Sequence, residues 1–439
     1  MTAEITWINH AGFELTAGGL KIVHDPWLVG TAFDNGWSLL SKTVFNADDF
    51  ADVDYIWFSH EHPDHFSVPS IKSIPQEYRG KITVLFQETK DKRVVKFCEK
   101  AGFRVLELKN GVRTNLNDQV AVTCGAVLGR DSWLFTETPD ATIFNANDCV
   151  GVNWEAVAAE LPRDVDVLMT QFSFANWVGN PGDHDRMRQA AEEKLHAMQA
   201  QIDVFKPHIV MPFASYVWFS HEKNFHMNEH ANKIGMVAEK IGQHVDVVIL
   251  YPGDRYKVGE PNDNSTAIAR YEADGAQHQA PLRTEEASIV VADLIALSQK
   301  EQKRIRKENW MWALTPLKST RLFEPISIYL DDLGEGISYS MFGGILSTGL
   351  RVDECDMSCS SASFAGMLRN GYGYSTLMIN ARYVELRPGV ADRLSRHFAI
   401  AARNEEGDYI PGLLLRRDYV IFQLRRLFGL ANYSTGVTK

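Results

Sequence analysis

Residues 60–65 read His-Glu-His-Pro-Asp-His and bring three imidazoles and two carboxylates together. His60 and His62 are two residues apart, so in an extended loop their rings project to the same side and can share one metal ion. Asp64 and His65 then supply ligands to a second ion, while the proline between the two pairs stiffens the loop. Such a cluster would be costly without a metal or solvent around it. The segment therefore predicts a two-metal site, with a solvated acidic loop as the alternative.

The motif follows residues 53–59, an apolar segment bounded by acidic sequence. An apolar run of this length is typical of a strand inside a sheet. Ligand groups at the carboxyl end of a buried strand point into the cleft beyond the sheet. Asp148 follows a second predicted strand near 141–145, so we expect its carboxylate in the same cleft. The alternative is that Asp148 caps the next helix.

The pattern His-x-His-x-Asp-His after a hydrophobic strand resembles the signature of the metallo-β-lactamase superfamily, over roughly residues 4–254. Trp-Ile-Asn-His-Ala at 7–11 and Asp-Pro-Trp at 25–27 resemble the subgroup containing L-ascorbate-6-phosphate lactonase and N-acylphosphatidylethanolamine-hydrolysing phospholipase D. Further motifs look like the CMP-N-acetylneuraminate hydroxylase family: Asp-Pro-Trp-Leu at 25–28, Gly-Thr-Ala-Phe at 30–33, Gly-Trp-Ser-Leu-Leu at 36–40, Asn-x-Asn-Asp-Cys at 145–149, and Pro-Phe-Ala-x-Tyr with Ser-His between 212 and 221.

The resemblance implies roles for three residues outside the histidine motif. Asp148 would be the carboxylate that bridges the two metal ions, which suits ions roughly 3.5–4 Å apart. Asp25 would be an outer carboxylate that orients a ligand histidine. His10 would lie nearby, either supporting a ligand or contacting the substrate, and a hydrogen-bonding histidine at a strand end is the alternative.

Two histidines that the superfamily usually carries are missing from this chain. One normally lies before the bridging carboxylate, but no histidine occurs between His65 and Asp148. We expect Asp131, just before a predicted strand at 132–136, to replace it, with the side chains at 124 and 137 as alternatives.

The second missing histidine normally ends a strand that reads Ile-Pro-x-His, and Ala214 occupies that place here. His221, His226 and His230 follow soon afterwards, and we expect His221 to replace it because the hydroxylase-like pattern also contains this residue. The predicted metal ligands are therefore His60, His62, Asp64, His65, Asp148, Asp131 and His221. The predicted catalytic and supporting residues are Asp64, His10 and Asp25.

The ligand changes bear on the chemistry. Two zinc ions would generate hydroxide at neutral pH and suit hydrolysis of a phosphodiester, lactone or thioester. Replacing imidazole by carboxylate hardens the site, and mixed ligands with open positions favour iron that activates oxygen. We therefore expect two divalent metal ions, iron before zinc, in an oxygen-dependent hydroxylase (a monooxygenase) acting on a small polar substrate. The alternatives are a dizinc metallohydrolase and a binding protein with a degenerate site.

An oxygenase of this kind needs electrons from outside. The sequence contains no Rieske iron–sulfur motif and no Gly-x-Gly-x2-Gly dinucleotide fingerprint between a strand and a helix. A separate ferredoxin-type or reductase partner would be required, unless the substrate itself supplies the electrons.

Composition narrows the class of protein further. The net charge of −11 argues against nucleic acid as a partner. The five cysteines are odd in number and scattered, so we expect no disulfide framework and a reducing, cytoplasmic location. The start of the sequence is already strand-like rather than a signal peptide, and no apolar run predicts a membrane span.

The order of predicted elements indicates an α/β fold. Strand meanders come first and then alternate with helices, which suits an αββα sandwich followed by a smaller α+β domain. We expect a metallo-β-lactamase-like catalytic domain at 1–260, a polar linker or surface excursion at 261–285 and the C-terminal domain at 286–439. The last of these would shape the substrate entrance or mediate assembly into a homo-oligomer.

Overall fold

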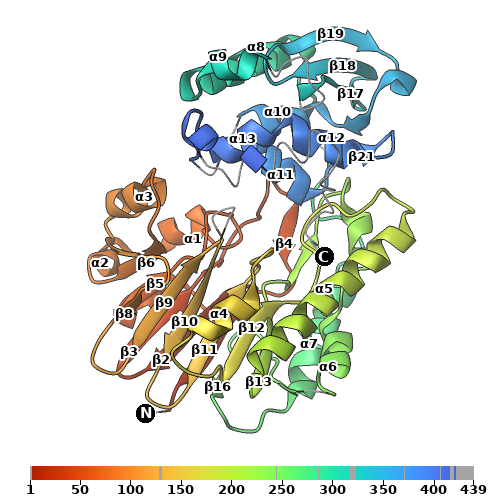
Figure 1. Cartoon of the computed structure of the whole chain (residues 1–439). Coiled ribbons are helices and arrows are strands. Elements are labelled where there is room, and N and C mark those ends of the chain that lie inside the picture. Colours follow the sequence, from red (N-terminus) through yellow and green to blue (C-terminus); the bar gives the residue numbers. More distant parts are fainter. Residues whose placement is uncertain are drawn as a thin grey trace.

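Two seven-stranded sheets pack face to face and carry helices on their outer faces (Figure 1). The computed structural model describes residues 2–127, 131–243, 245–284, 286–316, 323–369, 371–405, 407–415 and 420–421. This arrangement is the expected αββα sandwich, and the additional C-terminal unit of helices and a sheet is also present.

The first sheet has the strand order β16-β1-β2-β3-β5-β6-β7 and runs antiparallel in its first half and parallel in its second. Its strands are β1 (Glu4–Asn9), β2 (Gly12–Ala17), β3 (Leu20–His24), β5 (Tyr55–Trp57), β6 (Thr83–Gln87), β7 (Arg104–Leu108) and β16 (Arg255–Lys257). Its outer apolar side chains pack with helices α1 (Val68–Ser73) and α3 (Arg93–Ala101), beside the short α2 (Gln76–Arg79).

The second sheet has the order β15-β13-β12-β11-β10-β9-β8. Its strands are β8 (Arg113–Asn115), β9 (Ala121–Ala126), β10 (Ser132–Glu137), β11 (Thr142–Asn147), β12 (Val167–Gln171), β13 (Ile209–Phe213) and β15 (Asp246–Val247). The helices on its side are α4 (Trp154–Glu160), α5 (His184–Phe205), α6 (Ile234–Ile241) and α7 (Asn264–Gln277). A separate ribbon pairs β4 (Trp37–Leu39) with β14 (Val217–Phe219). The helix predicted at 184–205 is confirmed with both of its ends.

Helix α7 lies in the stretch 261–285, where the polar composition predicts a linker or surface excursion. The Asp263 side chain caps the helix by accepting a hydrogen bond from the Ser265 amide at 2.9 Å. Ala267 and Tyr271, four residues apart, are buried on one face of the helix. The Tyr271 hydroxyl donates to Leu250 O at 2.8 Å, which fixes the helix to the sandwich. Two buried residues per four turns were too sparse a pattern to reveal the helix from the sequence.

The C-terminal unit contains a sheet with the order β19-β18-β17-β20-β21. Its strands are β17 (Ile326–Leu330), β18 (Glu335–Ser340), β19 (Gly344–Leu350), β20 (Met357–Cys359) and β21 (Val384–Glu385), and its helices are α8 (Val291–Glu308), α9 (Met311–Leu314), α10 (Ser361–Arg369), α11 (Gly373–Asn380), α12 (Val390–His397) and α13 (Ala399–Glu405). The prediction of a strand at 375–386 was wrong over its first half, which belongs to α11, while the two-residue β21 lies in its second half. A short apolar run fits a strand or a buried helix equally well, and packing decides. Of the helix predicted at 413–429, residues 416–419 and 422–429 lie outside the described residues.

The C-terminal unit shares its hydrophobic core with the sandwich. Trp27, Trp37 and Trp177 of the sandwich belong to the same buried cluster as Leu330 and Tyr383. Figure 1 shows the unit above one end of both sheets. The unit is therefore held in place over the end of the sandwich by apolar packing.

Glu405 is buried inside this unit. We expect it to make the stability of the protein depend on pH. Burial raises the pKa of Glu405 to about 8, although the Ser375 hydroxyl donates to the carboxylate. The unfolded chain releases this proton near the ordinary value of 4.5, so the free energy of unfolding should fall as pH rises from 4.5 to about 8. The slope should approach about 1.4 kcal/mol per pH unit.

The variant Glu405→Gln should flatten this slope, because the amide resembles the protonated acid and does not titrate. Urea unfolding across the same pH interval measures the slope directly. Glu239→Gln, an exposed position on α6, is the matched control and should leave the slope unchanged. An equal slope in Glu405→Gln and the native chain would contradict this assignment.

Candidate metal centre

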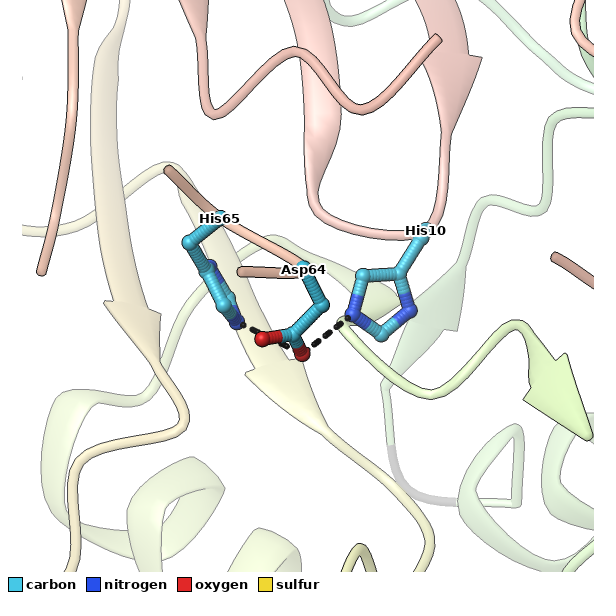
Figure 2. Close-up of side chains that lie close together, drawn as sticks. All are labelled: His10, Asp64 and His65. Carbon is cyan, nitrogen blue, oxygen red and sulfur yellow. Dashed lines mark hydrogen bonds and ion pairs between the residues drawn. The ribbon is translucent and has the colours of Figure 1, made fainter. Parts of the chain in front are cut away.

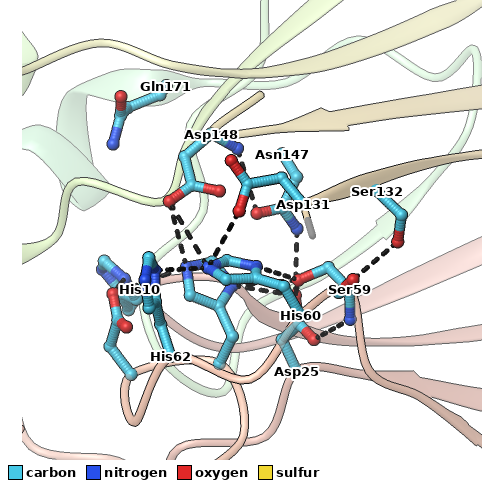
Figure 3. Close-up of polar contacts among 12 residues, drawn as sticks. His10, Asp25, Ser59, His60, His62, Asp131, Ser132, Asn147, Asp148 and Gln171 are labelled. Carbon is cyan, nitrogen blue, oxygen red and sulfur yellow. Dashed lines mark hydrogen bonds and ion pairs between the residues drawn. The ribbon is translucent and has the colours of Figure 1, made fainter. Parts of the chain in front are cut away.

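The histidine motif forms the loop after β5, and its first two histidines converge on Asp131 (Figure 3). His60 Nε2 lies 2.8 Å from His62 Nδ1 and 3.8 Å from Asp131 Oδ1. Asp131 directly precedes β10 in the opposite sheet, so the group spans the sandwich. Ligands about 2.0–2.2 Å from a common ion lie roughly 3–4 Å apart, and this group has that spacing.

A second group joins Asp64 and His65 to His10 (Figure 2). Asp64 Oδ2 lies 3.2 Å from His10 Nε2 and 3.4 Å from His65 Nε2. His10 occupies the turn between β1 and β2 with a φ of 46°, a left-handed conformation that is uncommon for a residue with a side chain. The sequence suggested His10 only as support or substrate contact, whereas the structure places its ring against the second acid of the motif.

Asp148 lies between the two groups. Its Oδ2 is 3.8 Å from His60 Nε2 and 3.6 Å from His65 Nε2. A register shift at the end of β11 gives Asn147 a φ of 54° and turns the following residue into the cleft. The carboxylate thus has the position that a bridge between two ions requires.

The chemistry of these side chains fits a pair of cations. Asp64 Oδ1, Asp148 Oδ1 and His65 Nε2 are buried atoms without a hydrogen-bond partner among the described residues. Buried polar atoms rarely lack a hydrogen-bond partner. Three such atoms in one cluster indicate a site that a bound group would complete. Two divalent ions would supply that satisfaction and offset the three negative charges of Asp64, Asp131 and Asp148.

Burial keeps most of these imidazoles unprotonated, the state in which they can bind a metal ion. Burial lowers the pKa of His60 to about 3 and also lowers the pKa of His62 and His10. These rings are therefore neutral at physiological pH. Burial would also lower the pKa of His65, but the surrounding aspartates outweigh it and raise the pKa well above its ordinary value. A metal ligand must be unprotonated, so we expect ion binding to release a proton from His65.

Asp25 supports the motif from beneath. Its Oδ2 lies 2.9 Å from His65 Nδ1 and accepts from Ser59 Oγ at 2.6 Å and Asn147 Nδ2 at 2.9 Å. Ser59 Oγ in turn lies 2.9 Å from His60 Nδ1. The network leaves Nε2 of both histidines facing the cleft, which is how outer groups orient metal-binding imidazoles.

Replacing Asp25 by asparagine is expected to weaken metal binding about 10–100-fold without unfolding the protein. Asparagine keeps the shape but removes the charge that sets the tautomer of His65. Competition with a chromophoric chelator measures the affinity. The exposed Asp52→Asn is the matched control, and an affinity unchanged by Asp25→Asn would show that Asp25 does not orient the ligand.

His221 lies apart from the groups of potential ligands described above. Its Nδ1 accepts a hydrogen bond from the Lys223 amide at 3.2 Å, and its Nε2 lies 3.9 Å from Glu286 Oε2. None of the potential metal-binding groups found among the described residues contains it. The geometry gives no support to the expectation that His221 replaces the missing superfamily histidine, so we leave it out of the proposed ligand set.

Lys194 lies beside the centre and was not singled out from the sequence. Its Nζ donates to Gln171 Oε1 at 2.6 Å. Burial lowers the pKa of Lys194, and the nearby negative charges of Asp148 and Asp131 partly oppose that shift. Figure 3 shows Gln171, the last residue of β12, on the Asp148 side of the cluster. The available signal was a lysine on the inward stripe of α5, three residues after the buried Ala191.

The C-terminal unit contacts the loop that carries the histidine motif. The Tyr372 hydroxyl, just before α11, donates to the Glu61 carboxylate inside the motif. The Arg93 guanidinium stacks over the Tyr372 ring at 5.0 Å from its centre and lies 3.6 Å from Glu61. These contacts place the C-terminal unit at the edge of the metal centre.

A family model described as the β-lactamase superfamily domain matches residues 4–274, well over half of the chain. The chain belongs to the metallo-β-lactamase superfamily. Its match ends inside α7, in agreement with the packing of that helix on the sandwich.

Two relatives are named cytidine monophosphate-N-acetylneuraminic acid hydroxylase. The protein from Danio rerio is 29% identical over 252 residues, which cover 52% of this chain and 41% of the relative. That from Mus musculus is 27% identical over 248 residues, covering 52% and 42%. The match therefore spans about two fifths of the length of these curated relatives.

Solved structures similar to the chain include a hydroxylase and a hydrolase. The diiron β-hydroxylase CmlA from Streptomyces venezuelae has a TM-score of 0.41 at 14% identity, covering 58% of this chain and 54% of its own. Igni18, a metallo hydrolase from Ignicoccus hospitalis, has a TM-score of 0.41 at 13% identity, covering 58% and 98%. Among the described residues, no helix is both long and apolar enough to cross a membrane.

Proposed function

We propose that this protein is an oxygen-dependent hydroxylase with a dinuclear iron centre. One ion would be held by His60, His62 and Asp131, the other by Asp64, His65 and His10, with Asp148 shared. The observation that carries the proposal is Asp131, because it puts a carboxylate where the superfamily usually has an imidazole. Mixed nitrogen and oxygen ligands favour iron over zinc. The hydroxylase names of the curated relatives support the same chemistry.

The bound iron would supply the activation of oxygen, and the protein would supply position and charge. The overall reaction inserts one oxygen atom into a C–H bond: substrate, O2, two electrons and two protons give the hydroxylated product and water. The described residues hold no redox cofactor motif, so a ferredoxin-type or reductase partner would deliver the electrons.

The cleft favours a small polar substrate. Lys194 and Gln171 place an ammonium group and an amide beside Asp148, and both can hydrogen-bond an anionic or hydroxyl group. The Tyr372–Glu61 contact supports a role of the C-terminal unit in shaping the entrance.

The second candidate is a dizinc hydrolase of a phosphodiester, lactone or thioester. Three neutral imidazoles and a bridging carboxylate also suit zinc, which would lower the pKa of a bound water to about 7. The same donor atoms would hold it, so metal identity and reaction must be measured together.

The deciding experiment loads metal-stripped protein anaerobically with Fe(II) or with Zn(II). The hydroxylase proposal expects two irons per chain and oxygen uptake by the reduced protein, both lost in Asp148→Ala. Cleavage of bis(p-nitrophenyl) phosphate or p-nitrophenyl acetate by the zinc form, with an iron form inert to oxygen, would select the hydrolase instead. A native chain that binds neither metal would reject both proposals.

A further inference from the structure

A second cluster of potential metal ligands lies on the surface, outside the dinuclear centre. His184 Nδ1 is 3.0 Å from His230 Nε2 and 3.4 Å from Glu229 Oε1, and His230 Nε2 is 3.8 Å from the same Glu229 oxygen. The three donor atoms therefore form a small triangle. None of these residues has a role in the chemistry proposed above.

The spacing fits a single tetrahedral ion. Ligands about 2.0–2.2 Å from zinc at tetrahedral angles lie about 3.3–3.6 Å from one another, and the three measured distances bracket this value. The two rings are inclined at 69°, so they approach from different sides instead of stacking. Two imidazoles and a carboxylate are a donor set that zinc uses in proteins.

The backbones that carry these ligands are fixed to each other. His184 begins α5, while Glu229 ends a 3-10 helix, η2 (Phe225–Glu229), and His230 follows it as the C-cap. His226 Nε2 of η2 lies 3.2 Å from Gly179 O in the loop that leads into α5. The Asn228 side chain also ties η2 to Phe219 through hydrogen bonds of 2.8 and 2.9 Å. Because these backbone segments are already held in place, ion binding costs little backbone conformational entropy, which strengthens binding.

We propose that His184, His230 and Glu229 form a third metal site, which binds one zinc ion and ties α5 to η2. The side chain of Glu229 is 55% exposed and that of His184 is 46% exposed, so the ion has access from solvent. His184 also lines a surface cavity of about 740 Å³ together with Arg186, Arg188 and Arg387. An open fourth position beside these arginines suits water or a small anion.

The test compares the zinc content of the native full-length chain with that of the double variant His184→Ala/His230→Ala. Metal-stripped proteins are dialysed against buffered micromolar zinc, and zinc per chain is measured by elemental analysis. We expect the native chain to hold one ion more than the double variant, and zinc to raise its midpoint of thermal unfolding by a larger amount. His196→Ala, an exposed histidine on the same helix, is the matched control and should match the native content.

The difference between the variants counts only the third ion, so it does not depend on what the dinuclear centre binds or catalyses. Equal zinc contents in the native and double-variant proteins would overturn the proposal. If the double variant does not fold, Glu229→Gln provides a second test. This variant keeps both imidazoles and removes only the charged carboxylate ligand. It should bind the extra ion at least ten times more weakly, and an unchanged affinity overturns the proposal.

Discussion

Replacing Asp148 by alanine is expected to lower the affinity for both metal ions by more than about 100-fold. Changing a residue that only orients a ligand typically lowers metal affinity by about 10–100-fold. The carboxylate lies 3.8 Å from His60 Nε2 and 3.6 Å from His65 Nε2, one histidine from each group. Its loss removes a ligand from both ions at once and leaves the site with one negative charge less. Any turnover that depends on the ion pair should disappear with it.

Elemental analysis after dialysis, followed by chelator competition, measures this loss. Asp148→Asn separates charge from size, because it keeps the shape and removes the negative charge. Asp140→Ala is the matched control, since this aspartate is exposed in the turn before β11. The far-ultraviolet circular dichroism of the Asp148 variants should equal that of the native chain. A full complement of two tightly bound ions in Asp148→Ala would show that the carboxylate is not a shared ligand.

The clustering of Asp148 with the histidine motif could be predicted because the signal is local. Each follows a buried strand, β11 or β5, and the carboxyl ends of such strands open into the cleft. Asp131 also precedes a strand that the sequence reveals, and the sandwich then brings it within 3.8 Å of His60. Local pattern and topology therefore agree in bringing these side chains together.

Other features depend on packing between distant parts of the chain. Helix α11 looked like a strand, because Leu377 and its apolar neighbours fit either element until the core around them is known. Lys194 was not singled out from the sequence, and its contact with Gln171 appears only once α5 is packed on the second sheet. Leu377 carries no local pattern that separates a strand from a buried helix.

His10 and His221 give the sharpest contrast. Of the three histidines that follow this strand, His221 was favoured because the hydroxylase-like pattern also contains it. In the structure the backbone amide of Ala214, at the end of that strand, donates to His10 O at 3.1 Å. The turn that carries His10 therefore lies directly against the position where the superfamily histidine is missing. We therefore propose that His10, rather than His221, takes the place of the missing histidine.

His10→Ala is therefore expected to lose the second metal ion, with an affinity at least about 100-fold lower, while the first ion stays bound. His10 Nε2 is 3.2 Å from Asp64 Oδ2, whereas the first ion would rest on His60, His62 and Asp131. His221→Ala should retain both ions, because its ring faces Glu286. Metal titration followed by calorimetry resolves the two binding steps in each variant. Loss of an ion in His221→Ala with both retained in His10→Ala would reverse the assignment.

Returning a histidine to the strand end provides the complementary test. Ala214 has a φ of 51°, a left-handed conformation in which histidine is found more often than most residues. The double variant His10→Ala/Ala214→His vacates one ring position and fills the neighbouring one. We expect it to recover the second ion that His10→Ala loses, since the new imidazole starts from backbone that adjoins residue 10. Recovery would show that the two positions serve one ligand site, reached in this chain from the β1–β2 turn.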